Sequence, residues 1–209
     1  MVAGDKRRSA KNLEIKPPEY ISDICLRSEH TRDSCLISLL YLSGRRINEV
    51  LHLKKKDIVF TGNFLSFETF NEKCFRSKPQ GYYSIFRKNR YYEKIHCDFS
   101  TTSEAYHILS PFILEHIKDL DDDEYIFKKF RGKGYIGSTM GYKIIRFLCP
   151  EIWPHWLRHQ RFSAVTEQLK DLPTADLIYS LKEFTKHHRT DSTLAYIHRM
   201  RSVEIKKQI

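Results

Sequence analysis

The sequence predicts an α+β fold that is mainly helical, with a small three-stranded antiparallel sheet placed between helices. Helix-type apolar segments occur before residue 54 and again after residue 103, while residues 57–99 consist of short strand-like segments separated by turn residues. The chain of 209 residues is 41% hydrophobic and 13% aromatic, which is enough to build a core. One folded domain, with or without an arm, is therefore expected.

The N-terminal third predicts an arm followed by two helices. Residues 1–19 carry five lysines and arginines before Pro17-Pro18, so we expect a basic arm or linker there and a single domain over residues 20–209. Residues 29–42 predict a buried helix, which Gly44 would end because glycine accepts the left-handed conformation. A short second helix is expected next, with an apolar face made of Ile47, Val50, Leu51 and Leu53.

The middle of the chain predicts the sheet and the C-terminal half predicts helices. Residues 57–60 and 64–70 flank the turn residues Thr61-Gly62-Asn63 and indicate a hairpin. Residues 81–86 and 91–99 indicate further strands around the basic turn 87–90, so the sheet should have about three strands. Thr101-Thr102-Ser103-Glu104 provides capping chemistry for the next helix. Later helices are expected near 138–148, 154–170, 174–184 and 191–200.

The net charge indicates the class of binding partner, and the cysteine content indicates the cellular compartment. The net charge of +10 favours an anionic partner, nucleic acid before membrane. Arg7, Arg8 and the basic residues at 54–56 and 128–133 are candidates for phosphate contacts that do not read sequence. No apolar run is long enough to span a bilayer, and the polar N-terminus does not resemble a secretory signal. The five cysteines are odd in number, widely spaced and without a C-x-x-C pair, which favours a reducing cytoplasm.

One helix carries an arginine and a histidine where its pattern asks for apolar residues. Phe162, Val165 and Leu169 recur at the spacing of a buried stripe, and the same stripe extends back through Arg158 to His155. All five positions fall within roughly 80° around the helix axis. Buried charge is costly unless it is paired. The N-terminal end of this helix is therefore a candidate anion site, because a helix N-terminus also favours phosphate.

Two further features complete a set of residues suited to phosphate chemistry. Arg46 precedes Glu49 by three residues, so the carboxylate can hold the guanidinium in one orientation. Near the C-terminus, His187 precedes Tyr196 by nine residues, and Asp191 can cap a short helix that carries the tyrosine. A late tyrosine preceded by two separated arginines and two histidines is suited to attacking a phosphodiester.

These motifs, in this order, resemble the tyrosine recombinases, the family that includes the phage integrases, Cre and the Xer recombinases. Gly44-Arg45-Arg46-Ile47-Asn48-Glu49 resembles the family's first arginine box, and His155-Trp156-Leu157-Arg158-His159 resembles its second. The resemblance covers about residues 20–200 and includes the helix–sheet–helix order. Each box is short and degenerate, but together they are fairly specific.

The resemblance implies the catalytic set and shows where this chain departs from the pattern. It assigns catalytic roles to Arg46, Lys88, His155, Arg158, His187 and Tyr196, with Tyr196 as the nucleophile. The lysine belongs to a hairpin turn in the family, and Lys73, Lys78 and Lys94 are alternatives to Lys88. Thr185-Lys186 replaces the usual Leu-Gly, so His188 competes with His187, although the nine-residue spacing favours His187. We expect this chain to lack the family's N-terminal core-binding domain, as an excised catalytic domain or an unusually small enzyme.

The family chemistry implies a site-specific recombinase or integrase that cleaves and rejoins DNA through a 3′-phosphotyrosine. Two arginines would bind the phosphate, so no metal and no cofactor are expected. The expected partner is double-stranded DNA, with a tetramer of the chain on two duplexes, accessory DNA-bending proteins as further candidates, and no membrane. We expect a cytoplasmic, DNA-associated protein.

The sequence is also compatible with three other classes of protein. A zinc hydrolase could use His155 and His159, but the residues between them lack the glutamate of such helices, and Arg158 repels a cation. A type IB topoisomerase shares the tyrosine chemistry and would relax DNA without exchanging strands. A non-catalytic DNA-binding protein would bind DNA without cleaving it.

Overall fold

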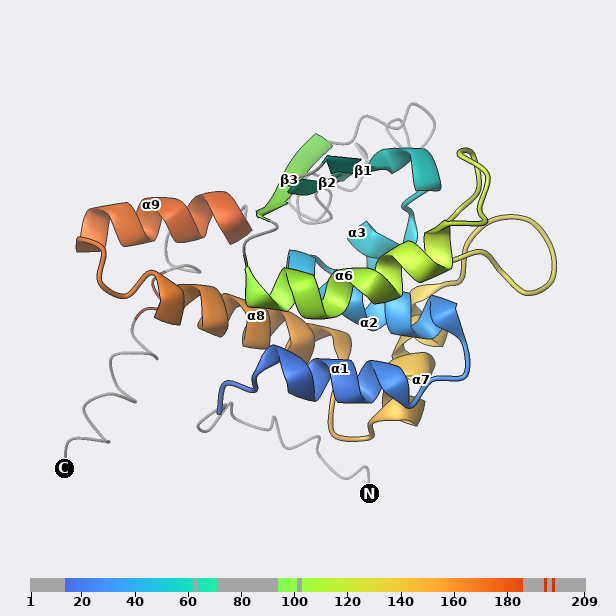
Figure 1. Cartoon of the computed structure of the whole chain (residues 1–209), viewed down its shortest axis with the longest axis horizontal. Helices are drawn as coiled ribbons and strands as arrows, with labels where there is room; N and C mark the ends of the chain where they lie inside the picture. Colours follow the sequence, from blue (N-terminus) through green and yellow to red (C-terminus); the bar gives the residue numbers. More distant parts are fainter. Residues whose placement is uncertain are drawn as a thin grey trace, which may run out of the picture.

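Helix α2 (Thr31–Ser43) runs through the middle of the molecule and organises the remaining helices (Figure 1). The computed structural model describes residues 14–61, 64–70, 94–100 and 103–185, together with the single residues Leu194 and Ile197. Every residue of α2 from Asp33 to Ser43 is buried. A helix buried on all sides belongs inside a layered helical domain. Accordingly α1, α3, α6, α7 and α8 all pack against it.

The first helices follow the predicted pattern except at the N-terminus. The helix predicted over residues 29–42 is α2, and Gly44 ends it in the left-handed conformation with φ of 57°. The predicted second helix is α3 (Ile47–Leu51). However, α1 (Pro18–Leu26) was not predicted, and it begins inside the expected arm because proline is favourable in the first turn of a helix. Residues 1–13 of that arm lie outside the described residues.

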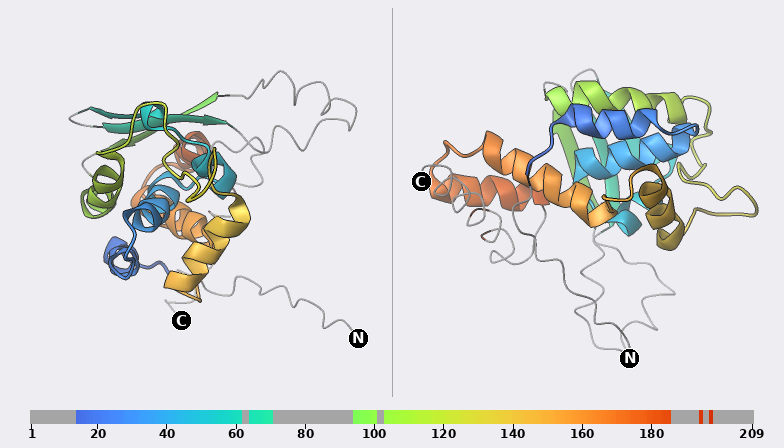
Figure 2. Two further views of the ribbon diagram at one scale, coloured as in Figure 1. Left: turned by 90° about the vertical axis from the view of Figure 1, so that its right-hand side faces the viewer. Right: turned by 90° about the horizontal axis from the view of Figure 1, so that it is seen from below.

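The sheet is antiparallel, with strand order β1-β2-β3 among the described residues. Strands β1 (Ile58–Thr61) and β2 (Phe64–Phe70) form the predicted hairpin, and β3 (Lys94–Ser100) pairs along the whole of β2. A single turn of 3-10 helix (Lys55–Asp57) leads into β1. Alternate residues Leu65, Phe67 and Thr69 are buried, so one face of the sheet covers the helices (Figure 2). The predicted strand 81–86 and turn 87–90 lie outside the described residues.

The C-terminal half contains the helices that the sequence predicts. Helix α6 (Glu104–Ile117) is capped by Ser103, whose Oγ accepts a hydrogen bond from the Tyr106 amide at 3.2 Å. Helices α7 (Ser138–Leu148), α8 (Pro154–Gln168) and α9 (Thr174–Thr185) follow. The last predicted helix, residues 191–200, lies outside the described residues except for Leu194 and Ile197, which have helical backbone. None of the described helices has the length and apolar composition that a bilayer span requires.

The buried apolar residues form two separate groups. The main core surrounds α2 and extends to the sheet and α7. A smaller group, which we call the C-terminal cluster, consists of Val165, Leu177, Leu181 and Ile197. Phe184 packs against both groups. The end of α9 therefore joins the C-terminal cluster to the rest of the domain.

Candidate active site

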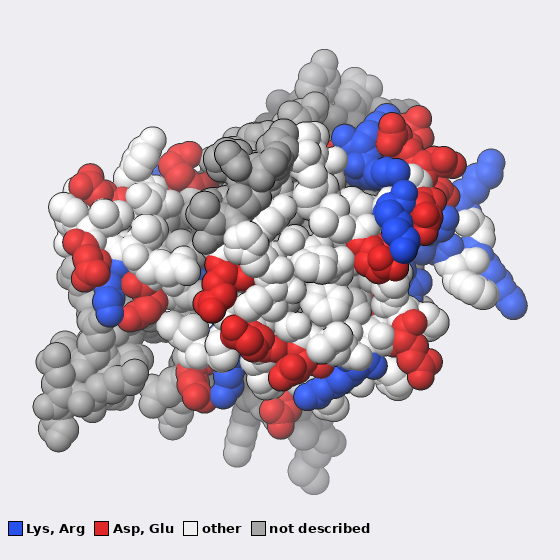
Figure 3. All heavy atoms as spheres, viewed as in Figure 1, with Lys and Arg blue, Asp and Glu red and all other residues white. Residues whose placement is uncertain are grey.

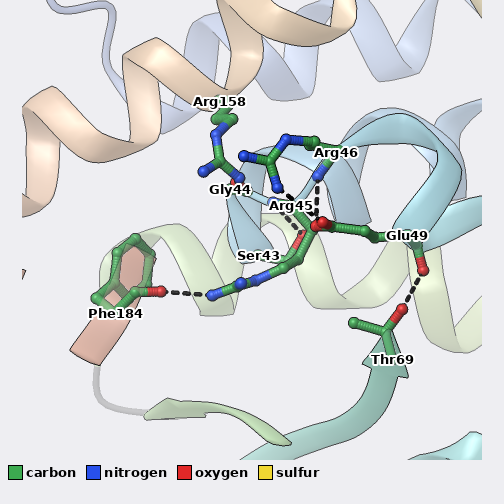
Figure 4. A network of polar contacts seen from close by, with 8 residues as sticks. All are labelled: Ser43, Gly44, Arg45, Arg46, Glu49, Thr69, Arg158 and Phe184. Carbon is green, nitrogen blue, oxygen red and sulfur yellow. Dashed lines mark hydrogen bonds and ion pairs between the residues drawn. The ribbon is translucent and has the colours of Figure 1, made fainter. Parts of the chain in front are cut away.

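A sharp corner at Gly44 brings α3 and α8 together (Figure 4). The residue lies in the left-handed region, and a Cβ there would sit only 2.6 Å from Phe162 Cε1. Glycine is therefore required for both the backbone conformation and the close approach. The carbonyl of Gly44 accepts a hydrogen bond from Arg158 Nη1 of α8. The second predicted arginine is thus fixed to the turn that carries the first.

Arg46 is held by a buried carboxylate, as its spacing from Glu49 predicted. Arg46 Nη1 lies 2.9 Å from Glu49 Oε1, and the Arg46 amide donates to Glu49 Oε2 at 3.0 Å. The side chain of Glu49 is fully buried, whereas that of Arg46 remains 23% exposed. Because both carboxylate oxygens bind the same residue, the guanidinium is fixed while part of it stays accessible to a ligand.

The sheet is tied to this pair through Thr69. Thr69 Oγ1 is buried and donates to the backbone carbonyl of Glu49. This bond links the end of β2 to α3 (Figure 4). The segment that follows β2 in sequence contains the predicted lysine Lys88, which lies outside the described residues, as does Lys73 and Lys78. The structure therefore anchors the strand that leads into this segment next to Arg46.

Helix α8 carries the predicted site residues Arg158 and His155. The stripe predicted to be buried on this helix is buried over most of its length. Arg158, Phe162 and Val165 are buried, and the Arg158 guanidinium lies 4.4 Å from the centre of the Phe162 ring. At His155 the stripe reaches the surface, where this exposed ring meets His159 at 4.2 Å between centroids. The N-terminal end of α8 thus places a buried cation one turn from an exposed imidazole.

Of the six predicted catalytic residues, the structure describes three. Arg46 and Arg158 meet at the Gly44 corner, and His155 lies one helical turn before Arg158. Lys88, His187 and Tyr196 lie outside the described residues. Within the described part of the chain, no group of three or more His, Cys, Asp or Glu side chains is placed to hold a metal ion.

The motifs gave no role to two buried arginines near this site. Arg45 Nη2 donates to the Phe184 carbonyl at 2.5 Å, and the Arg161 guanidinium lies over both Tyr41 and Phe184, at 5.9 and 5.7 Å from the ring centres. Burial of Arg161 could have been predicted from its position three residues after Arg158, on the same side of α8. For Arg45, the sequence shows only that it is adjacent to Arg46, which does not indicate that it is buried.

Charges are unevenly distributed over the surface. The face formed by α1 and α6 shows scattered acidic side chains, while basic side chains, interleaved with acidic ones, gather near the loop after α6 (Figure 3). Helix α6 lies on one side of α2 and α3 on the other, so this face is turned away from the Gly44 corner (Figures 1 and 2).

Several of the lysines expected to contact phosphates make ion pairs within the chain. Lys54 and Lys56 lie 3.6 and 2.5 Å from Asp123, and Lys128 lies 2.7 Å from Glu124. Lys55 Nζ donates to the Leu120 carbonyl at 2.5 Å. Exposed pairs of this kind contribute little to stability, so they can open when a polyanion binds.

This architecture is the fold of tyrosine recombinase catalytic domains. The XerH site-specific recombinase, in a post-cleavage complex with its palindromic difH substrate, matches 92% of this chain and 51% of its own chain with a TM-score of 0.63 and 16% identity. The XerA recombinase matches 99% and 68% with a TM-score of 0.59 and 17% identity. The integrase of transposon Tn1549, in complex with circular intermediate DNA, matches 90% and 62% with a TM-score of 0.53 and 15% identity. The fold predicted from the resemblance is confirmed.

Sequence comparison adds a relative from a mobile element. Transposase A of transposon Tn554 from Staphylococcus aureus is 27% identical over 164 residues, which are 74% of this chain and 40% of the transposase. This chain therefore spans well under half the length of that relative. No family model matches the chain.

Proposed function

We propose that this chain is the catalytic domain of a site-specific DNA recombinase that cleaves and rejoins strands through a 3′-phosphotyrosine at Tyr196. The observation that carries the proposal is the Gly44 corner. There, two arginines from distant parts of the sequence meet, one fixed by the buried Glu49 and the other by the Gly44 carbonyl. The recombinase fold around this corner and the order of the sequence motifs support the same function.

The two arginines would bind the non-bridging oxygens of the scissile phosphate. A guanidinium presents two parallel N–H donors, which match two phosphate oxygens better than an ammonium does. Arg46 and Arg158 are held before any ligand binds, so charge that develops in the transition state meets donors that need not reorganise. The exposed His155 sits one turn from Arg158, within the same helix end.

The remaining roles follow from the motifs. The Tyr196 oxygen attacks phosphorus, its proton passes to His155, and the bond from phosphorus to the 5′-oxygen breaks. Lys88 protonates that 5′-oxygen, and His187 donates to a phosphate oxygen. The products are a 3′-phosphotyrosine and a 5′-hydroxyl. When the 5′-hydroxyl of another strand attacks the phosphotyrosine, the steps reverse and the tyrosine leaves.

The comparisons support DNA as the substrate and a mobile element as the setting. The Tn1549 integrase structure contains circular intermediate DNA, and the Tn554 relative is a transposase. On this proposal, four copies of the chain would act on two duplexes, with accessory DNA-bending proteins in some reactions. The acidic α1 and α6 face, turned away from the Gly44 corner, would point away from the DNA (Figure 3).

A covalent-trapping experiment tests the proposal. Nicked suicide duplexes tiled across the DNA that flanks the gene are incubated with the chain, and adducts are resolved by denaturing gel electrophoresis. We expect an adduct with the unmodified chain and with Tyr179→Phe, a control tyrosine exposed on α9. We expect none with Tyr196→Phe. An adduct that persists in Tyr196→Phe would overturn the assignment of the nucleophile.

Assays of strand exchange, plasmid relaxation and DNA binding separate the proposal from a topoisomerase and from a non-catalytic DNA-binding protein. Strand exchange between two duplexes marks a recombinase, while relaxation of supercoiled plasmid without exchange marks a topoisomerase. Binding to all duplexes without any adduct marks a non-catalytic DNA-binding protein. Either of the last two results would contradict the proposed recombination.

A further inference from the structure

The end of α9 is the place where the C-terminal cluster meets the main core. Phe184 contacts both groups of buried residues, and its ring lies edge-on to Phe162 with 5.7 Å between the ring centres. The chain continues from here toward His187 and Tyr196. Farther on, Ile197 is 3% exposed and packs into the C-terminal cluster. The residues on both sides of the proposed nucleophile are thus anchored to the same small unit.

Two buried arginines hold this junction. Arg45 is 3% exposed and bonds to the carbonyl of Phe184, while Arg161 is 6% exposed and lies over the ring of the same residue. The last carbonyls of a helix lack partners within the helix and carry its negative end, so cations are favourable there. Arg45 and Arg161 therefore form a clamp on the end of α9.

The clamp connects directly to the proposed phosphate site. Three consecutive residues hold three elements: the Gly44 carbonyl binds Arg158 of α8, Arg45 binds α9, and Arg46 binds Glu49 of α3 (Figure 4). Because these residues are adjacent in the backbone, the contacts to α8, α9 and α3 converge on one turn. The end of α9 and the proposed phosphate site are therefore held by the same three residues.

Burial of the Arg161 charge is unfavourable for the stability of the fold. Its Nε has no hydrogen-bond partner among the described residues, and its guanidinium is flanked by the rings of Tyr41 and Phe184. Burial lowers the pKa of Arg161 and raises that of the Tyr41 hydroxyl. An apolar side chain of similar volume would suit this position at least as well for stability alone.

We infer that Arg45 and Arg161 are positioning residues, which fix the end of α9 against the Gly44 corner. In this way they would set the position of the proposed nucleophile relative to the bound phosphate. The inference rests on the proposed function. It does not involve contact of either arginine with DNA, because both are buried against protein. A displacement of a reacting group by about 1 Å is enough to slow a reaction by roughly a hundredfold.

The test measures the clamp and the chemistry separately. Amide hydrogen exchange in α9 is followed without DNA in the unmodified chain, Arg45→Leu, Arg45→Lys and the control Arg27→Leu, an exposed arginine after α1. Covalent-adduct rates at saturating suicide duplex and the Kd for the same duplex are measured in parallel.

For Arg45→Leu we expect about tenfold faster exchange at the end of α9 and an adduct rate lower by about tenfold or more, with little change in Kd. Arg45→Lys keeps one donor for the Phe184 carbonyl and should recover part of both losses, and Arg27→Leu should match the unmodified chain. Unchanged exchange in Arg45→Leu would overturn the clamp. Faster exchange with an unchanged adduct rate would overturn its positioning role. Absence of an adduct in the unmodified chain would instead contradict the proposed function, while the exchange data still decide the clamp.

A second variant keeps the inference testable if Arg45→Leu does not fold. Arg161→Met removes a buried charge and should leave the thermal unfolding temperature equal or higher, yet lower the adduct rate. A merely structural arginine would not separate these two quantities in this way. A stable Arg161→Met with an unchanged adduct rate would exclude Arg161 from the clamp.

Discussion

Replacing Gly44 with alanine tests how tightly the corner is built. An alanine there must adopt φ of 57°, and its Cβ would lie 2.6 Å from Phe162 Cε1. Ordinary contacts of a Cβ begin at 3.4 Å, so the ring would have to retreat by about 0.8 Å. Phe162 is fully buried between Arg158 and Phe184, which leaves it little room to move.

The two costs can be estimated separately. The left-handed backbone costs an alanine about 1–2 kcal/mol, and overpacking of a filled core costs about 1–3 kcal/mol more. Together they amount to about 2–5 kcal/mol, or a fall in Tm of roughly 2–4 °C for each kcal/mol in a chain of this size. Gly132→Ala supplies the matched control, because Gly132 has φ of 83° and nothing within 4 Å of an added Cβ. It should show the backbone cost alone.

Urea unfolding of four variants completes the assay. Gly44→Ala should lose more stability than Gly132→Ala, and combining Gly44→Ala with Phe162→Leu should cost less than the two single changes added together, by about 1–3 kcal/mol. If Gly44→Ala and Gly132→Ala lose the same free energy of unfolding, or if the double variant is strictly additive, the close approach of Phe162 to the corner is wrong.

Three further outcomes follow from the site and its surroundings. Glu49→Gln should lower the free energy of unfolding by about 1–3 kcal/mol, measured by urea titration, because one buried acceptor for Arg46 is replaced by a donor. Arg158→Lys should fold normally but slow adduct formation by about 10²–10³-fold, since the ammonium cannot reproduce the forked pair of donors; a rate within threefold would contradict this. Burial lowers the pKa of His116 below its ordinary value of 6.5, so its contribution to stability is complete above that pH and is lost as the pH falls through the lowered folded pKa. His116→Gln should therefore flatten the decline of Tm on acidification, and a decline as steep as in the unmodified chain would contradict this.

The local features of this fold could be predicted from the sequence because short-range spacing determines them. Arg46 and Glu49 pair because they are three residues apart at the start of α3, and Arg158 is buried because it continues the stripe of Phe162. Gly44 ends α2 because only glycine adopts its conformation without strain. These three features alone outline the phosphate-binding corner.

Contacts between distant segments were not predictable in the same way. Neither the bond from Arg45 to Phe184 nor that from Thr69 to Glu49 has a sequence signature, because both depend on how α9 and β2 dock. Helix α1 was missed because Pro17-Pro18 and the preceding basic residues indicated a linker, whereas the helix buries its own residues Ile21, Ile24 and Cys25. The buried position of Arg161 likewise runs against the usual preference of arginine for the surface.

The most direct test of the central claim is to identify the covalent bond itself. The adduct formed on a suicide duplex is digested with nuclease and protease, and the nucleotide-linked peptide is sequenced by mass spectrometry. We expect a single linked residue, Tyr196, joined to a 3′-phosphate, with a free 5′-hydroxyl on the released strand. A nucleotide on any other residue, a 5′-phosphate linkage, or DNA cleavage without a covalent intermediate would contradict it.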